Sequence, residues 1–357
     1  MWTNSPKNSD EQGQKSTSLV RLAAKSPSCF LSVISASTLT LFFIVLTFLA
    51  LLVSLPQLIP SFNFGSEALA TLQTDCQTDL SKGQWFATPS SSEVTWKWDQ
   101  QVQERCDFRF YEKSDLVASV EGKRILFIGD SNIRILFSNL LCLVSGKTLC
   151  QQNQKLSPTF VKNATYGSVN LEYGWAQFAV NVSSYLSSLS EMSPEIMPDI
   201  LVLGTAAWDA KYGPKVFNVA PNETEYFRHE LSKIRDGIQR LVRTKGSTGK
   251  QLMLVWQTPT FLHGSIFKKQ DPAGLYPWFP ERNEQLAKVI SASGLLAPQG
   301  PCIVLDFHSF TRPRPDLTRS NHDTVHYKDP LYELGIQILA NGIYKSQIWS
   351  GNVTKII

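Results

Sequence analysis

The chain has 357 residues, of which 43% are hydrophobic, and it carries a formal net charge of +4. This length allows one α/β domain of ordinary size together with additional segments. The net charge is small and the basic residues form no stripe, so the composition excludes a nucleic-acid-binding protein as the expected class.

The first distinctive feature is an uncharged stretch that runs from Ser26 to Ser66. Within it, residues 30–55 form an apolar run that is long enough to cross a bilayer as a helix. Basic residues outnumber acidic ones before this run, and positive charge favours the cytoplasmic side. We therefore predict a disordered cytosolic tail over residues 1–29, a transmembrane anchor over 30–55 and a stem over 56–75. A cleaved signal peptide is the alternative, although the apolar run is long for one and begins late.

Features that follow the anchor agree with a location on the far side of the membrane. Five of the six cysteines lie there, and an oxidising lumen permits disulfide bonds. Because five is odd, at least one thiol is free or pairs between chains, and Cys142, inside an apolar helical run, is the candidate for the free one. N-glycosylation sequons occur at four asparagines after the anchor: Asn163, Asn181, Asn222 and Asn352.

A segment rich in cysteine and tryptophan covers residues 76–115. It contains many aromatic residues but few long apolar runs, and Cys76 and Cys106 bracket most of it. We expect this segment to form a small loop-rich collar on the main domain.

The main domain is expected over residues 116–348, with a short tail over 349–357. Apolar runs predict five strands, at residues 124–128, 169–173, 200–204, 252–257 and 302–307. Amphipathic spacing and flanking Pro or Gly residues predict helices at residues 132–144, 223–243, 280–291 and 331–343. Strands that alternate with helices indicate parallel βαβ units in a three-layer α/β/α sandwich.

The triplet Gly129-Asp130-Ser131 is the most informative motif of the chain. It separates the first predicted strand from the first predicted helix, so Ser131 lies on a strand-to-helix turn at the carboxyl end of a strand. Open α/β sheets place their ligands at that edge. The helix N-terminus that follows points backbone N–H groups toward an anion that forms beside the serine. Asp130 is expected to hold the turn with its carboxylate.

A serine hydroxyl becomes a nucleophile when a base lies within hydrogen-bond reach and an acid orients that base. Asp323 and His326 supply such a pair, three residues apart in a polar loop expected at residues 319–328. His322 neighbours Asp323 and is the competing base, but its spacing from the acid is less suitable. We therefore predict that Ser131 is the nucleophile, His326 the base and Asp323 the acid that orients it.

Donors for a developing oxyanion are expected from loops at the same edge of the sheet. Besides the Ser131 backbone N–H, the candidates are backbone N–H groups at or near Gly204 and Gly174. Trp208 is either a platform for a sugar ring or a tryptophan at the edge of the core. Arg134, one turn after Ser131, either contacts substrate or forms a local ion pair.

The sequence predicts neither a bound metal nor a bound cofactor. It contains no Cys-x-x-Cys spacing, no acidic calcium loop and no glycine-rich nucleotide loop.

Residues 121–134, with Gly129-Asp130-Ser131, and the pair Asp323 and His326 together resemble the GDSL/SGNH hydrolase superfamily. The resemblance is stronger to its PC-esterase branch, which includes plant trichome birefringence-like polysaccharide O-acetyltransferases and the luminal domains of sialate and capsule O-acetyltransferases. The Cys76–Cys106 region with its tryptophans is similar to the plant group, whereas residues 131–134 and 204–208 are more like the sialate and capsule group. The resemblance covers most of residues 76–345.

This resemblance implies a flavodoxin-like parallel sheet, a Ser-His-Asp triad and an acetyl-serine intermediate, in a Golgi membrane protein with one span and a luminal catalytic domain. Many superfamily members carry an Asn oxyanion donor in their third conserved block. Gly204 lies near that position here, which favours backbone donors. The sialate and capsule enzymes carry a multi-span region after the catalytic domain, and no second apolar span follows it here. We therefore expect a separate acetyl donor of unknown identity, with a donor-transporting protein as a possible partner.

Three functions are compatible with these features. The first is transfer of an acetyl group to a hydroxyl of a glycan or polysaccharide. The second is an acetyl-esterase of the same fold, in which water replaces the sugar hydroxyl as acceptor. The third is a glycan-binding protein without catalytic activity, against which the complete Ser-His-Asp set argues.

Overall fold

The computed structural model describes residues 75–349 except 88–93, 146–161, 167, 219–221, 272 and 321–322. The predicted cytosolic tail, the membrane anchor, most of the stem, most of the C-terminal tail and the sequon at Asn352 lie outside the described residues. Among the described helices, none has the length and apolar composition of a membrane span. All described residues belong to one compact unit, residues 63–357.

The centre of this unit is a six-stranded sheet in the order β4-β5-β3-β6-β7-β8. Five strands are parallel to their neighbours in this order: β5 (Val169–Trp175), β3 (Arg124–Gly129), β6 (Ile200–Gly204), β7 (Met253–Gln257) and β8 (Ile303–Leu305). The second parallel strand of the chain lies outside the first, which is the flavodoxin-like strand order. The five predicted strands and the α/β class are confirmed. The edge strand β4 (Lys162–Tyr166), antiparallel to β5, was not predicted.

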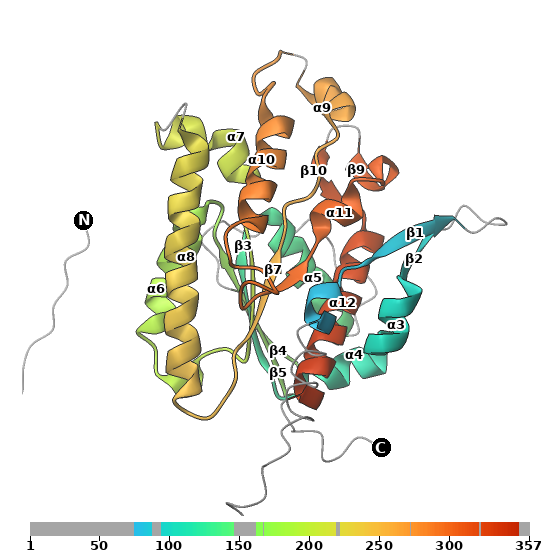
Figure 1. Cartoon of the computed structure of the whole chain (residues 1–357), viewed down its shortest axis with the longest axis vertical. Helices are drawn as coiled ribbons and strands as arrows, with labels where there is room; N and C mark the ends of the chain where they lie inside the picture. The colour runs from blue at the N-terminus through green and yellow to red at the C-terminus, as the bar shows by residue number, and fades with distance from the viewer. Residues whose placement is uncertain are drawn as a thin grey trace, which may run out of the picture. The chain divides into compact units, whose positions relative to one another are not determined.

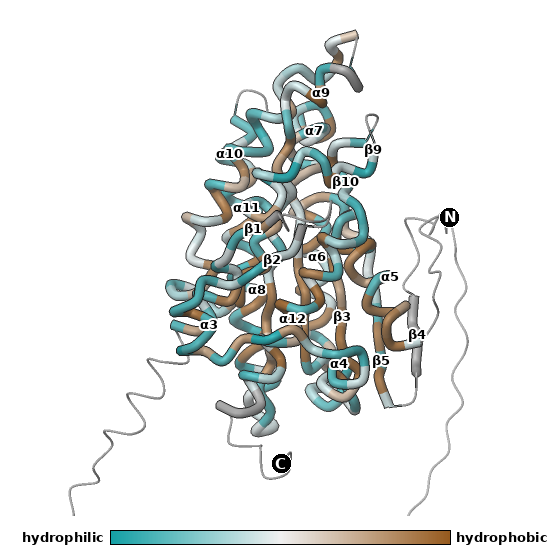
Figure 2. Tube along the Cα trace, turned by 90° about the vertical axis from the view of Figure 1, so that its right-hand side faces the viewer, coloured by the Kyte–Doolittle hydropathy of each residue, from teal (hydrophilic) through white to brown (hydrophobic). Residues whose placement is uncertain are grey.

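Helices cover both faces of the sheet, as Figure 1 shows. One face packs against α5 (Ser131–Ser145) and α12 (Asp329–Trp349), the other against α6 (Ala179–Ser190), α8 (Glu223–Gly246) and α10 (Phe279–Ser291). Side chains of β3 alternate between these two layers, because successive strand residues point to opposite faces. Ile125 and Phe127 enter the first core and Leu126 and Ile128 the second. Figure 2 shows the corresponding hydrophobic colour along β3, β5 and α5.

The four predicted helices are confirmed as α5, α8, α10 and α12, each extended by one or more residues. The helices α6, α7 (Ala207–Val216), α9 (Gly264–Gln270) and α11 (Phe307–Thr311) were not predicted. In α6 the serine content obscured the pattern, since serine favours turns. Its serine hydroxyls instead donate to carbonyl oxygens of the preceding turn, as Ser184 does to Val180 O at 2.8 Å.

The predicted collar is more regular than expected. It contains an antiparallel hairpin of β1 (Gly83–Ala87) and β2 (Val94–Trp98), followed by α3 (Gln100–Cys106) and the start of α4 (Lys113–Val120). A disulfide joins Cys76 to Cys106 with a Cα–Cα distance of 5.6 Å. The expectation of a loop-rich segment was therefore wrong. Trp96 and Trp98 alternate with exposed residues along β2 and are buried in the first core, and this burial stabilises the strand.

The expectation for the free cysteine was also wrong. Cys142 of α5 is disulfide-bonded, and the free cysteine among the described residues is the buried Cys302. Burial raises the pKa of the Cys302 thiol to about 12, so this thiol is protonated and inert at neutral pH.

Three sequon asparagines fall within the described backbone. Asn163 belongs to β4, Asn181 to the first turn of α6, and Asn222 precedes α8. The side chains of Asn181 and Asn222 are exposed. Glycosylation at these positions stays a prediction.

Two glycines allow α5 to pack directly onto the ends of β3 and β6. Gly129 and Gly204 are register partners, and a Cβ on Gly129 would lie 2.2 Å from Gly204 O and 2.6 Å from Ile133 Cγ1. A Cβ on Gly204 would lie 2.9 Å from Ile133 Cδ1. The Ile133 side chain of α5 therefore fills the space that these positions leave empty, and this contact sets the height of Ser131 above the sheet.

We predict that Gly129→Ala lowers the free energy of unfolding by about 1–3 kcal/mol, because the added methyl meets a backbone oxygen and must displace α5. Gly246→Ala is the matched control, since nothing lies within 4 Å of the Cβ built there at the end of α8. The control should be neutral or more stable by up to about 1 kcal/mol. Chemical denaturation of the full-length variants measures both changes, and equal stability of the two variants would contradict this account of α5 packing.

Candidate active site

Ser131 is the first residue of α5, directly after β3 and the Gly129-Asp130 turn. The Asp130 carboxylate accepts the Asn132 backbone N–H at 2.9 Å, which satisfies one of the free N–H groups at the start of the helix. The expectation that Asp130 holds the turn is confirmed. Ser131 is only 7% exposed, so its hydroxyl lies in a largely desolvated position at the carboxyl edge of the sheet.

A continuous hydrogen-bond chain joins Ser131, His326 and Asp323. His326 Nε2 lies 2.6 Å from Ser131 Oγ, and His326 Nδ1 lies 2.8 Å from Asp323 Oδ2. The Asp323 carboxylate also accepts the His326 backbone N–H at 3.1 Å. With Nδ1 donating to the carboxylate, Nε2 presents its lone pair to the serine hydroxyl, the arrangement needed for general-base activation.

The backbone that carries this pair differs from the expected loop. Asp323 and His326 lie on β10 (Asp323–Tyr327), which pairs with β9 (Thr318–Ser320) in an antiparallel hairpin. The pairing register shifts between Asp323 and Tyr327, as in a β-bulge. Residues three apart on a regular strand point to opposite faces, and this irregularity lets the two side chains meet. The competing base His322 lies outside the described residues.

The loop after β7 supports the strand that carries His326. Thr260 Oγ1 donates to Val325 O at 2.8 Å, and the Tyr327 hydroxyl donates to Phe261 O at 2.8 Å. These two bonds hold β10 on either side of His326.

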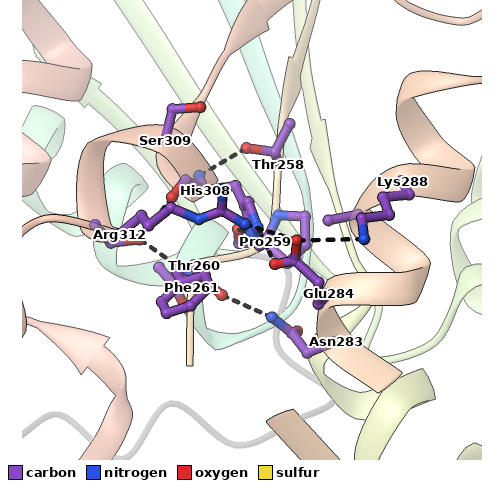
Figure 3. A network of polar contacts seen from close by, with 12 residues as sticks. Thr258, Pro259, Thr260, Phe261, Asn283, Glu284, Lys288, His308, Ser309 and Arg312 are labelled. Atoms are coloured by element: carbon purple, nitrogen blue, oxygen red, sulfur yellow. Dashed lines mark hydrogen bonds and ion pairs between the residues drawn. The ribbon is translucent and has the colours of Figure 1, made fainter. Parts of the chain in front are cut away.

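A second polar network contacts the same loop from α10 and α11 (Figure 3). Glu284 of α10 lies 2.7 Å from His308 Nε2 and 2.6 Å from Arg312 Nη2, while His308 Nδ1 lies 3.3 Å from Pro259 O. His308 therefore has a carboxylate partner. Both of its ring nitrogens are engaged and neither meets a hydroxyl, so this pair serves to position the loop rather than to activate a nucleophile.

The two candidate oxyanion loops follow the strands on either side of β3. Gly174 lies near the end of β5, where its Cα faces the ring of Tyr185. Gly204 ends β6 beside Gly129. Ala206, two residues on, has φ of 137°, a strained conformation for a residue with a side chain. The structure brings both loops to the edge that holds Ser131, and the oxyanion roles of Gly174 and Gly204 remain predictions.

Asp209 joins these two loops and was not singled out from the sequence. Its carboxylate accepts the Ala179 backbone N–H at 3.1 Å and the Thr205 hydroxyl at 3.0 Å. It therefore connects the loop after β6 to the start of α6. An acidic residue just after an apolar strand end, at the edge expected to hold the site, was the signal that could have identified it.

Burial dominates the ionisation of the acids near Ser131. It raises the pKa of Asp209 to about 7 and that of Asp130 to about 6, against the hydrogen bonds that each carboxylate accepts. For Asp323 burial also opposes ionisation. The hydrogen bonds and charge of His326 outweigh it there and hold the pKa of that carboxyl below its ordinary value. Asp323, which accepts the imidazole hydrogen bond, is therefore ionised at neutral pH.

Trp208 and Arg134 both lie beside the serine turn. The Trp208 ring contacts Trp175, Phe178 and Tyr212, with centroid distances of 6.2, 6.1 and 5.0 Å, and is only partly buried. The Arg134 guanidinium lies 5.6 Å from the Trp175 ring centroid. No ion pair to Arg134 occurs among the described residues. The described residues therefore do not form the local ion pair that was one of the two alternatives for Arg134.

No family model matches the chain. Protein ALTERED XYLOGLUCAN 9 of Arabidopsis thaliana is 23% identical over 257 residues, which cover 67% of this chain and 65% of that protein. Protein trichome birefringence-like 31 of the same plant is 24% identical over 142 residues, 38% of this chain and 32% of that protein. The chain is a distant relative of these plant proteins.

The resemblance to trichome birefringence-like proteins is thus confirmed as distant homology. The chain spans less than two thirds of the length of either plant relative.

Solved structures of esterases also align with part of the chain. A carbohydrate esterase family 3 protein from Talaromyces cellulolyticus has a TM-score of 0.35 and 11% identity, covering 65% of this chain and 100% of that chain. Axe2, an acetylxylan esterase from Geobacillus stearothermophilus, has a TM-score of 0.29 and 14% identity, covering 65% and 95%.

We predict that Asp209→Asn removes a pH-dependent loss of stability. The folded-state pKa of Asp209 is raised to about 7, so the folded protein retains a proton that the unfolded chain releases near its ordinary pKa. The associated stability is present at low pH and declines by up to about 1.4 kcal/mol per pH unit as the pH rises toward 7. Asparagine carries no such charge and can still accept a hydrogen bond.

Chemical unfolding of the full-length chain at pH values between about 5 and 8 tests this sign. The free energy of unfolding of Asp209→Asn, relative to wild type, should increase as the pH rises. Asp236→Asn, at an exposed position of α8, is the matched control and should follow the wild-type pH dependence. Parallel curves for wild type and Asp209→Asn would show that Asp209 is not a carboxyl of raised pKa.

Proposed function

We propose that this protein is a serine O-acetyltransferase that moves an acetyl group onto a hydroxyl of a glycan or polysaccharide. The observation that supports it most strongly is the hydrogen-bond chain from Asp323 through His326 to Ser131 at the carboxyl edge of a flavodoxin-like sheet. The distant homology to a trichome birefringence-like protein agrees with the family resemblance of the sequence, and that resemblance implies acetyl transfer to a polysaccharide.

In the first half-reaction, Ser131 Oγ attacks the carbonyl carbon of an acetyl donor while His326 Nε2 accepts the hydroxyl proton. Asp323 stabilises the imidazolium that forms. The negative charge moves to the carbonyl oxygen, where the Ser131 backbone N–H and the N-terminal end of α5 are placed to stabilise it. The intermediate then collapses, His326 returns its proton to the leaving group, and acetyl-Ser131 remains.

In the second half-reaction, a sugar hydroxyl replaces the leaving group and the same steps run in reverse order. His326 accepts the proton of the sugar hydroxyl as its oxygen attacks the acetyl carbon. Collapse breaks the bond to Ser131 Oγ, which regains a proton from His326 and leaves an acetylated sugar. Water in place of the sugar would give an esterase, so exclusion of water decides between the two outcomes.

We further propose that the enzyme is a single-pass Golgi membrane protein with its catalytic domain in the lumen. The apolar run at residues 30–55, the basic residues before it and the sequons after it support this placement. No cofactor is part of the proposal, since the acetyl group comes from a separate donor. A donor-transporting membrane protein is the partner that this arrangement would need.

We predict that the full-length protein, incubated with a reactive acetyl ester and freed of N-glycans, gains the mass of one acetyl group. Ser131→Ala should gain none, because it lacks the nucleophile, and His326→Ala should gain it at least about 10³-fold more slowly. Intact-mass spectrometry at successive times measures the acetylated fraction. Ser309→Ala is the matched control and should acetylate like wild type, since the Ser309 hydroxyl bonds to Asp306 instead of an imidazole.

The fate of the acetyl group separates the two enzymatic functions. Faster loss of the acetyl group with an added oligosaccharide than in buffer, with an acetylated oligosaccharide as product, would support a transferase. Equal loss in buffer would identify an esterase. Acetylation of Ser131→Ala at the wild-type rate would contradict both.

A further inference from the structure

A row of four aromatic side chains leads away from Ser131 along α7. The row consists of Trp175, Trp208, Tyr212 and Tyr276, whose successive centroids are 6.2, 5.0 and 5.4 Å apart. It begins beside the nucleophile, because Trp175 is the register partner of Gly129. All four residues are partly exposed, and successive rings meet at interplanar angles of 83°, 37° and 76°, so the row offers several aromatic surfaces rather than one flat face. The apolar side chains Val216 and Leu275, 57% and 60% exposed, lie in the same segments.

Three cations accompany this aromatic row. The Arg134 guanidinium carbon lies 5.6 Å from the centroid of the Trp175 ring. The Lys211 Nζ atom lies 5.1 Å from the Tyr212 centroid and 5.0 Å from the Tyr276 centroid. The Lys215 Nζ atom lies 5.5 Å from the Tyr276 centroid. In the described part of the chain, no carboxylate forms an ion pair with any of the three. Asp271 lies five residues before Tyr276, and its carboxylate accepts the backbone N–H groups of Leu275 and Tyr276.

Basic residues on neighbouring elements behave differently. Arg282 pairs with Glu223 at 2.7 Å, and Arg312 and Lys288 both pair with Glu284. The cations of the aromatic row therefore form a local excess of positive charge held over aromatic faces, at the edge of the sheet where the nucleophile lies.

Each part of this surface selects a feature of the ligand. Partly exposed aromatic faces suit the apolar faces of sugar rings, and a series of them suits an extended chain. Unpaired cations attract negative charge, and ammonium and guanidinium groups bind carboxylates through charge-assisted hydrogen bonds. A neutral glycan would use the aromatic faces and leave the three cations without a counter-charge.

We infer that the aromatic row is a binding site for an acidic polysaccharide whose sugars carry carboxylates, and that this glycan is the acceptor presented to Ser131. The identification as acceptor rests on the proposed function, whereas the binding itself does not. Sugar rings contact the exposed parts of Trp175, Trp208, Tyr212 and Tyr276, and their carboxylates bind Arg134, Lys211 and Lys215.

Binding measurements on the full-length protein in detergent test this inference. The probes are an oligogalacturonide and a neutral xylo-oligosaccharide of the same length. The oligogalacturonide should bind at least about tenfold more tightly at about 0.02 M salt, and the difference should shrink at about 0.5 M because added ions screen the cations. Equal affinity for the two probes at low salt would overturn the inference.

Charge variants locate the site. Lys211→Gln/Lys215→Gln should bind the oligogalacturonide about tenfold or more weakly with little change for the neutral probe, and Lys211→Arg/Lys215→Arg should retain the preference. Lys113→Gln/Lys250→Gln removes the same charge at exposed positions on α4 and before β7 and should bind like wild type. If both double variants lost the same affinity for the oligogalacturonide, the loss would reflect net charge alone and the assignment of the binding site to the aromatic row would be overturned.

Ser131→Ala separates this inference from the proposed function, because it should bind the oligogalacturonide like wild type. If the wild type binds the oligogalacturonide selectively but forms no acetyl-Ser131, the binding site is supported and the proposed enzyme activity is contradicted. If acetyl-Ser131 forms but Lys211→Gln/Lys215→Gln binds the oligogalacturonide like wild type, the enzyme activity is supported and the binding site at the aromatic row is overturned.

Discussion

The close contact of α5 with the carboxyl ends of β3 and β6 is the constraint on which the site depends. Gly129 and Gly204 leave no side chain between the strands and Ile133, so the helix begins immediately above the sheet. The nucleophile is the first residue of that helix. Its position is therefore determined by backbone packing in the centre of the domain rather than by a flexible loop, which suits a group that must meet a base within about 3 Å.

The remaining parts of the site are attached to this central contact by polar side chains. Asp209 connects the loop after β6 to the start of α6, and Thr260 and Tyr327 hold the strand of His326 against the loop after β7. Keeping a carboxylate such as Asp209 fully buried opposes its ionisation. A strained Ala206 lies in the same region. Concentrated burial and strain of this kind are typical of sites that hold groups in a set geometry.

The sequence predicted the parts of the fold that have a strong local signal. Apolar runs identified all five parallel strands, and the amphipathic spacing of α8 identified the longest helix. The serine-rich α6, the hairpin of the Cys/Trp-rich segment and the β9–β10 hairpin were missed. Their regularity depends on hydroxyl groups that bond to the backbone and on tertiary burial of tryptophan, neither of which has a clear periodic pattern.

For the site, sequence spacing suggested Ser131, Asp323 and His326, and the structure brings these three side chains into contact. The sequence placed the Asp-His pair on a loop, whereas it lies on a strand with a shifted register. The Glu284–His308 pair could not be predicted, because it arises from contacts between elements far apart in the chain. For Asp209 the sequence offers only its place after an apolar strand, and its hydrogen bonds to Ala179 and Thr205 depend on the fold. The same holds for the aromatic row, which combines residues from β5, α7 and the segment before α10.

The most direct test of the central claim is the rate at which an organophosphorus ester phosphorylates Ser131 in wild type and in Asp323→Asn. Activation through the Asp323–His326 chain predicts a rate at least about 10³-fold lower in the variant, because asparagine no longer favours the tautomer that presents Nε2 to the hydroxyl. Asp236→Asn, at an exposed position, should react like wild type. If Asp323→Asn also reacted at the wild-type rate, Asp323 would not orient the base, and the account of this site as a Ser-His-Asp system would be wrong.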